Sequence, residues 1–192
     1  MPGLVEDSAE DAENQRDVTA AFEAAKYDFK KIPEIETWKD QFSAGNAQGR
    51  TRTKLLILEG SSRLGKTLFA IDLFKVENTC VIKCPGVQHP NLSAYDAGQH
   101  QVIVLDDPRP EQVGQYRHRL QAGRDPRVVH QSATQRYEVW NCLYNVPIII
   151  CSNDWSSATV NVDAELAAWI KENSVHYLVK DSLYNKPVGE QS

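Results

Sequence analysis

The pattern of apolar and polar residues changes in character along the chain. In the N-terminal part, residues 18–31 and 32–42 place apolar side chains at helical spacing and predict two helices, the second with Pro33 in its first turn. The stretch that follows, 43–53, is rich in Gly, Ser and Asn and predicts a linker. A different pattern begins after this linker.

Short apolar runs alternate with helical patterns in the rest of the chain. The apolar runs predict strands at residues 54–59, 79–83, 100–107 and 145–153, with a final strand at 175–180. The intervening patterns predict helices at 66–75, 110–123 and 162–174 (with Asp163 as an N-cap) and a hairpin at 127–140. Continuous runs of Val, Ile and Leu are typical of parallel strands covered on both faces. The sequence therefore predicts an α/β fold with a mainly parallel sheet behind a small helical N-terminal part.

These patterns divide the chain into three parts. Residues 1–48 form an acidic, helical segment in which we expect oligomerisation helices, residues 49–182 form the main domain, and residues 183–192 form a tail. A length of 192 residues suits one domain with a buried core.

The charge is unevenly distributed around a formal net value of −5. Residues 1–50 hold 11 acidic and 6 basic side chains, whereas residues 109–136 hold six arginines against Glu111 and Asp125. A local basic segment can face a phosphate backbone even when the total charge is negative. No apolar stretch approaches the length of a membrane helix, and the acidic N-terminus has no apolar core. We therefore expect a soluble intracellular protein without a membrane partner.

A glycine-rich loop separates the first predicted strand of the main domain from its helix. Gly60, Gly65, Lys66 and Thr67 match the pattern G-x-x-x-x-G-K-[ST]. Such a loop turns its backbone N–H groups toward phosphate, Lys66 neutralises the outer phosphate oxygens, and the hydroxyl of Thr67 binds Mg²⁺. The expected nucleotide-binding residues are Gly60, Ser61, Ser62, Arg63, Leu64, Gly65, Lys66, Thr67 and Leu68.

Polar side chains end two further apolar strands. Asp106 and Asp107 follow the run "VIVL", and Asn153 follows "PIIICS". Because parallel strands end at the same edge of a sheet, these side chains are expected beside the glycine-rich loop. One aspartate would hold Mg²⁺ and the other would act as a general base or position the attacking water. Asn153 would contact both the terminal phosphate and the water, and so distinguish intact from cleaved nucleotide.

These motifs, in this order, resemble those of superfamily III helicases. The closest likeness is to the helicase domain of replication initiator (Rep) proteins from small circular single-stranded DNA viruses, and it covers roughly residues 50–155. The resemblance implies a P-loop NTPase (AAA+-like) fold with ATP and Mg²⁺ as cofactors. It also implies a homo-oligomeric ring, usually a hexamer, that moves along single-stranded DNA, and it makes the host nucleus a candidate location.

Carried over to this sequence, the resemblance assigns a role to each motif. Lys66, Asp106, Asp107 and Asn153 would be catalytic, and Thr67 with Asp106 would hold the metal ion. The nucleic-acid-binding residues would lie in and around the predicted hairpin, at Arg124, Arg127, Arg136 and Tyr137.

Two departures from the family leave alternatives open. The arginine finger that the family places after the sensor strand has no counterpart, because Arg136 is the last arginine and only Lys171, Lys180 and Lys186 follow Asn153. The His-hydrophobic-His metal site of the family's nuclease is also missing, so we expect no nicking activity. We therefore expect the chain to be either a fragment or a host-integrated relative of the family.

The alternatives differ in activity and in substrate. One is a nucleotide-binding scaffold or DNA-binding module that hydrolyses ATP weakly or not at all. A second is an RNA helicase of the picornavirus-like type, whose motifs share this layout. A third, a P-loop kinase for a small molecule, is disfavoured because kinases rarely place a Ser-Asn sensor on a third strand.

Overall fold

A five-stranded parallel sheet forms the centre of the molecule. The computed structural model describes residues 28–42, 53–84, 90, 92–114, 117, 127–131, 138–143 and 146–185. The strands of the sheet are β1 (Leu55–Glu59), β2 (Thr79–Lys83), β3 (Val102–Asp106), β6 (Ile148–Ser152) and β7 (Ser174–Leu178). They lie in the order β2-β3-β6-β1-β7, and every pair is parallel. The predicted α/β fold with a parallel sheet is therefore confirmed.

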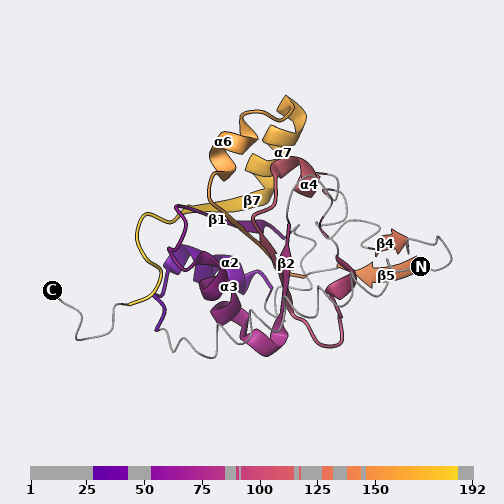
Figure 1. The fold of residues 1–192 in the computed structure, drawn as a ribbon, viewed down its shortest axis with the longest axis horizontal. Helices are drawn as coiled ribbons and strands as arrows, with labels where there is room; N and C mark the ends of the chain where they lie inside the picture. Colours follow the sequence, from indigo (N-terminus) through magenta and orange to yellow (C-terminus); the bar gives the residue numbers. More distant parts are fainter. Residues whose placement is uncertain are drawn as a thin grey trace, which may run out of the picture.

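Helices cover both faces of the sheet. On one face lie α2 (Pro33–Asp40) and α3 (Lys66–Phe74), and on the other lie α4 (Pro110–Gly114), α6 (Trp155–Thr159) and α7 (Ala164–Asn173) (Figure 1). Two short 3₁₀ turns, Val76–Asn78 and Leu92–Ala94, precede β2 and β3. None of the described helices is long and apolar enough to cross a membrane.

Alternate residues of each central strand enter two separate cores. Leu56 and Leu58 of β1 pack with Trp38 of α2 on one side of the sheet, while Leu55 and Ile57 pack with Trp155 of α6 on the other. Side chains of a strand point alternately to its two faces, so a strand buried on both must be apolar throughout. This arrangement explains the uninterrupted apolar runs.

The order of the strands brings three strand ends together. β6 lies between β1 and β3 in the sheet. After β1 the chain passes to β2 at one edge of the sheet, and β3 and then β6 fill the positions between β2 and β1. In open α/β sheets, ligands bind beyond the carboxyl ends of the strands where the strand order reverses. The loop after β1 and the polar residues that end β3 and β6 therefore meet at one place.

The predicted hairpin is also present. β4 (Arg127–Gln131) and β5 (Glu138–Cys142) form an antiparallel pair that extends to one side of the main sheet (Figure 1). The predicted helix at 110–123 begins as α4 and is helical again at Arg117, and its remaining residues lie outside the described part of the chain.

The end of the first predicted helix, 18–31, is wrong in the part that the structure describes. Phe29 forms a β-bridge with Tyr184, and the N–H of Lys30 donates to the carbonyl of Leu183 over 2.8 Å. The ring of Phe29 packs edge-on against Phe69 of α3 at a centroid distance of 5.8 Å. Tertiary pairing with the C-terminal segment thus overrides the local helical pattern. Residues 18–27 lie outside the described residues.

Candidate functional site

The loop between β1 and α3 has the shape of a phosphate-binding loop. Gly65 adopts φ 84°, a left-handed conformation that glycine tolerates best, and its carbonyl accepts the first helical hydrogen bond of α3 from the N–H of Phe69 over 2.8 Å. The nine-residue helix α3 begins at Lys66, so its positive N-terminal end faces the loop. A backbone of this form is suited to an anion.

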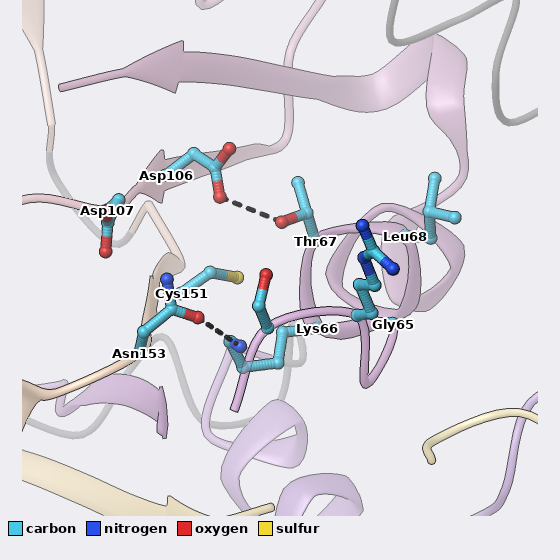
Figure 2. A pocket seen from close by; sticks show the side chains of 10 residues that line it. Gly65, Lys66, Thr67, Leu68, Asp106, Asp107, Cys151 and Asn153 are labelled. Atoms are coloured by element: carbon cyan, nitrogen blue, oxygen red, sulfur yellow. Dashed lines mark hydrogen bonds between the residues drawn. The ribbon is translucent and has the colours of Figure 1, made fainter. Parts of the chain in front are cut away.

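Lys66 connects this loop to the end of β6. Its Nζ donates to the carbonyls of Gly60 and Ser61 over 2.7 and 2.9 Å and to Oδ1 of Asn153 over 3.0 Å (Figure 2). Only 8% of Lys66 is exposed. This burial lowers the pKa of the ammonium group, although Asp106 and Asp107 act in the opposite direction. The residue is therefore a fixed, partly desolvated cation.

Thr67 and Asp106 form the other side of the site. The hydroxyl of Thr67 donates to Oδ1 of Asp106 over 2.8 Å (Figure 2). Asp106 is the last residue of β3 and lies on the same face as α3, because its position alternates with those of the buried strand residues. Asp107 follows with φ 56°, and its N–H donates to the carbonyl of Cys151 over 2.8 Å. Both aspartates line the same pocket as the residues of the loop.

These groups line one pocket of about 350 Å³. That volume lies in the range of roughly 300–1,000 Å³ common for small-molecule sites. The lining residues are Ser62, Arg63, Gly65, Lys66, Thr67, Leu68, Asp106, Asp107, Cys151 and Asn153. Of the residues expected from the sequence to bind a nucleotide or catalyse, Gly60, Ser61 and Leu64 lie outside this lining. Two of these, Gly60 and Ser61, still contact Lys66 through their carbonyls.

One lining residue of the pocket, Cys151, was missed from the sequence. Cys151 of β6 reaches the site between Thr67 and Lys66 (Figure 2), although its run of apolar neighbours indicates only a core residue. Burial raises the pKa of the Cys151 thiol, which keeps it neutral and unreactive. Arg63, one of the expected nucleotide-binding residues, also lines the pocket, and no acidic side chain among the described residues pairs with it.

The residues predicted to bind nucleic acid cannot be placed in the same way. Arg124, Arg136 and Tyr137 lie outside the described residues. Arg127 begins β4, and the structure describes its backbone but not its side chain. These four positions stay a prediction from the sequence.

Replacing Asp106 by Asn is expected to raise the stability of the ligand-free protein at neutral pH. Burial, and then repulsion by Asp107, raise the pKa of Asp106 above its ordinary 3.8 although Thr67 donates to it. The folded state therefore binds the proton more tightly than the unfolded state. As the pH rises from below 3.8 through the folded-state pKa, the parent protein loses stability relative to Asp106→Asn.

Urea denaturation of both proteins at about pH 4 and about pH 7, without nucleotide or Mg²⁺, measures this effect. The advantage of Asp106→Asn should be larger at the higher pH. An equal difference at both values would contradict the assigned burial of the carboxylate.

The donor set fits a nucleotide phosphate with Mg²⁺. Mg²⁺ prefers oxygen ligands and in nucleotide sites commonly takes one or two carboxylates together with phosphate oxygens and water. The Thr67 hydroxyl and the Asp106 carboxylate supply such oxygens 2.8 Å apart, and the Lys66 ammonium lies across the pocket to meet the phosphates. Within the described residues, no group of three or more His, Cys, Asp or Glu side chains is arranged to hold a metal ion.

Comparison with known proteins finds similar solved structures but no similar sequence. No protein-family model matches the chain, and no curated protein matches it in sequence. The solved structures that align with it include a crystal structure of DnaI, with a TM-score of 0.42 and 16% identity over 82% of this chain and 87% of that chain. The assignment of a P-loop NTPase fold depends on the strand order and the phosphate loop of this chain itself.

Proposed function

We propose that the protein binds ATP with Mg²⁺ at the pocket beyond β1, β3 and β6 and hydrolyses it as a nucleic-acid motor of the Rep-helicase type. The observation that carries this proposal is the convergence of the loop cation with polar groups from two other strand ends. Lys66 contacts Asn153, and Thr67 contacts Asp106, within one pocket. An amide at the end of β6 supports the motor over a kinase, because a kinase needs no such group.

Each residue has a role that its position supports. Lys66 holds the outer phosphate oxygens, and Thr67 with Asp106 holds Mg²⁺. When bound, Mg²⁺ neutralises charge on the phosphate oxygens. Asp107, which is exposed and faces the pocket, accepts a proton from the attacking water at its carboxylate. The side-chain amide of Asn153 orients that water and contacts the terminal phosphate.

Arg63 supports turnover despite the missing arginine finger. In other phosphoryl-transfer systems an arginine contributes roughly 10³ to 10⁵ in rate. Arg63 is exposed, lines the pocket and is held at φ 67° in the loop itself. Its guanidinium can therefore stabilise phosphate charge from within the same chain.

The nucleic-acid part of the proposal depends on the ribbon of β4 and β5. This ribbon extends away from the sheet (Figure 1), and its first residue is Arg127. In a homo-oligomeric ring, such ribbons would present their basic residues to a strand in the channel. Single-stranded DNA is the proposed substrate, on the strength of the sequence motifs.

The test is ATP hydrolysis by the purified chain at concentrations high enough to assemble a ring. Single-stranded DNA should stimulate turnover, and single-stranded RNA of the same sequence should stimulate it less. Failure to bind ATP under any of these conditions would contradict the proposed site. Stronger stimulation by RNA than by DNA would contradict the proposed DNA substrate and would identify the protein as an RNA motor.

A nucleotide-binding module without turnover is the second candidate. The observation that favours it is the absence of any arginine after Arg136 in the sequence. This candidate predicts measurable ATP binding, lost in Lys66→Ala, together with no hydrolysis with or without DNA. The same experiment therefore separates the two functions.

A further inference from the structure

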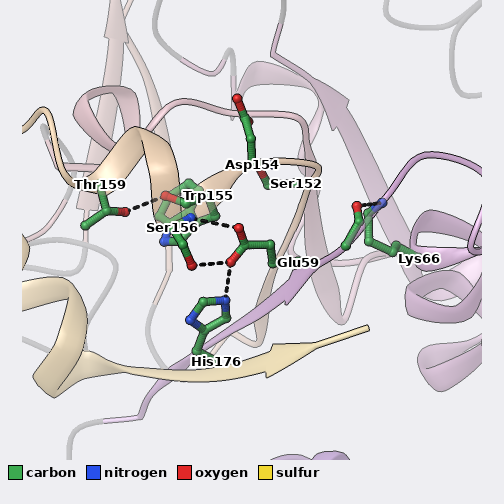
Figure 3. A network of polar contacts seen from close by, with 9 residues as sticks. Glu59, Lys66, Ser152, Asp154, Trp155, Ser156, Thr159 and His176 are labelled. Atoms are coloured by element: carbon green, nitrogen blue, oxygen red, sulfur yellow. Dashed lines mark hydrogen bonds and ion pairs between the residues drawn. The ribbon is translucent and has the colours of Figure 1, made fainter. Parts of the chain in front are cut away.

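A buried carboxylate directly before the phosphate loop binds a helix on the opposite face of the sheet. Glu59, the last residue of β1, is only 7% exposed. Its Oε1 accepts a hydrogen bond from the N–H of Ser156 over 2.9 Å, and its Oε2 accepts one from the Ser156 hydroxyl over 2.5 Å (Figure 3). Nε2 of His176 lies 2.7 Å from the same Oε2. The carboxylate is thus surrounded by donors from two other elements.

The position of Glu59 follows from the alternation along β1. Leu55 and Ile57 face the core beneath α6 and α7, so Glu59 faces the same side. There it meets the first turn of α6, whose own N-cap residue, Asp154, makes no side-chain hydrogen bond to the helix. The first N–H groups of a helix need acceptors, and a carboxylate is the favoured one. Glu59 supplies that acceptor from another strand.

The local environment keeps Glu59 ionised. Burial alone would raise its pKa, but the two hydrogen bonds from Ser156 and the neighbouring His176 outweigh burial and hold the pKa below its ordinary value. A protonated Glu59 would lose one of these acceptor positions. The contact is therefore built for a charged side chain.

The contact between Glu59 and Ser156 completes a closed series of bonds and hydrogen bonds beside the proposed site. Glu59 is covalently joined to Gly60, whose carbonyl accepts from Lys66. Lys66 also donates to Asn153, which stands three residues before Ser156. Ser156 in turn donates its two hydrogen bonds to Glu59, which completes the series. The loop and the polar end of β6 are thus held together on both faces of the sheet.

We infer that Glu59 is a positioning residue that fixes Asn153 against Lys66 and the phosphate loop by holding the start of α6. This inference rests on the proposed function for its catalytic consequence, but the geometry it describes exists without nucleotide. Without the carboxylate, the first turn of α6 is released and the side chain of Asn153 loses its fixed orientation. The phosphate loop itself keeps its backbone, so nucleotide still binds.

The experiment compares Glu59→Gln with Glu77→Gln, a matched change at an exposed glutamate in the 3₁₀ turn at the opposite end of the sheet. The first measurement is the NMR signal of the Asn153 side-chain amide in the ligand-free protein, assigned by its disappearance in Asn153→Ala. The signal should move in Glu59→Gln and stay in place in Glu77→Gln. Ser156→Ala, which removes one of the two hydrogen bonds at an exposed serine, should move it in the same direction by a smaller amount.

The second measurement separates binding from turnover. Hydrogen-bond partners of metal ligands typically contribute about 10- to 100-fold in activity. A comparable positioning effect means that Glu59→Gln should lower kcat about tenfold with little change in the Kd for ATP. An unmoved Asn153 amide signal in both Glu59→Gln and Ser156→Ala would overturn the inference, whatever happens to stability. If the parent protein lacks turnover, the proposed motor fails while the amide signal still decides the role of Glu59.

Discussion

Replacing Lys66 by alanine is expected to lower the rate of ATP hydrolysis by at least about 10²-fold and to weaken ATP binding strongly. Removal of a single donor to developing negative charge costs about 10² to 10³ in kcat in other enzymes. Lys66 is the buried cation at the centre of the loop, and Asp106 and Asp107 on the other side of the pocket repel phosphate once it is gone. The loss should therefore appear in both binding and turnover.

The same change should leave the fold largely intact. It removes three hydrogen bonds, to Gly60, Ser61 and Asn153. It also removes a charge that burial disfavours, as the lowered pKa of Lys66 indicates. Calorimetric titration with ATP and a thermal unfolding scan measure the two effects. Lys54→Ala is the matched control, because Lys54 is exposed and immediately precedes β1, at the opposite end of that strand from the phosphate loop. Parent-like ATP binding by Lys66→Ala would show that the loop does not hold phosphate.

The sheet could be predicted from the sequence because burial on both faces leaves a strong local signal. The three central strands, β1, β3 and β6, are buried on both faces and consist largely of apolar residues, and such runs are visible without knowledge of their neighbours. The same runs contain no information about which strands pair. The order β2-β3-β6-β1-β7 is set by packing between elements distant in sequence, so only the structure reveals it.

Helix α6 shows why short elements escaped prediction. Its five residues, Trp155–Thr159, are mostly polar and too few for a helical period to be visible. The helix is stabilised by Glu59, 97 residues away in sequence, rather than by its own cap. The wrong end of the helix predicted at 18–31 has a similar cause, because residues 28–30 pair with the distant segment 183–185.

The candidate site also has a part that could be predicted from the sequence and a part that could not. The convergence of Lys66, Asp106 and Asn153 could be expected. Parallel strands end at one edge of the sheet, and each residue stands at the end of a recognisable apolar run or in the loop that follows one. The contact of Glu59 with Ser156 and His176 could not be expected. Glu59 ends an otherwise apolar strand, and neither partner stands in a motif. Only the alternation of β1, combined with the observed position of α6, brings them together.

Replacing Gly60 by alanine is expected to destabilise the protein by about 1–3 kcal/mol or more, the range for overpacked sites. An added Cβ would lie 2.3 Å from the carbonyl oxygen of Val179 and 3.0 Å from its Cβ. Val179 cannot readily withdraw, because it is buried and its N–H donates to the carbonyl of Glu59 over 2.6 Å. On the other side, the N–H of Gly60 donates to the carbonyl of Ser152. Glycine is required at this position by the close approach of two backbones.

For a domain of this size, such a loss corresponds to a fall in Tm of roughly 2–12 °C. Gly98→Ala is the matched control, since its Cβ would meet only the flexible, exposed side chain of Asp96, at 3.2 Å. That change should leave Tm within about 2 °C of the parent, or raise it slightly by restricting the unfolded chain. Equal Tm values for the two variants would mean that the segment after β7 can move away from the loop.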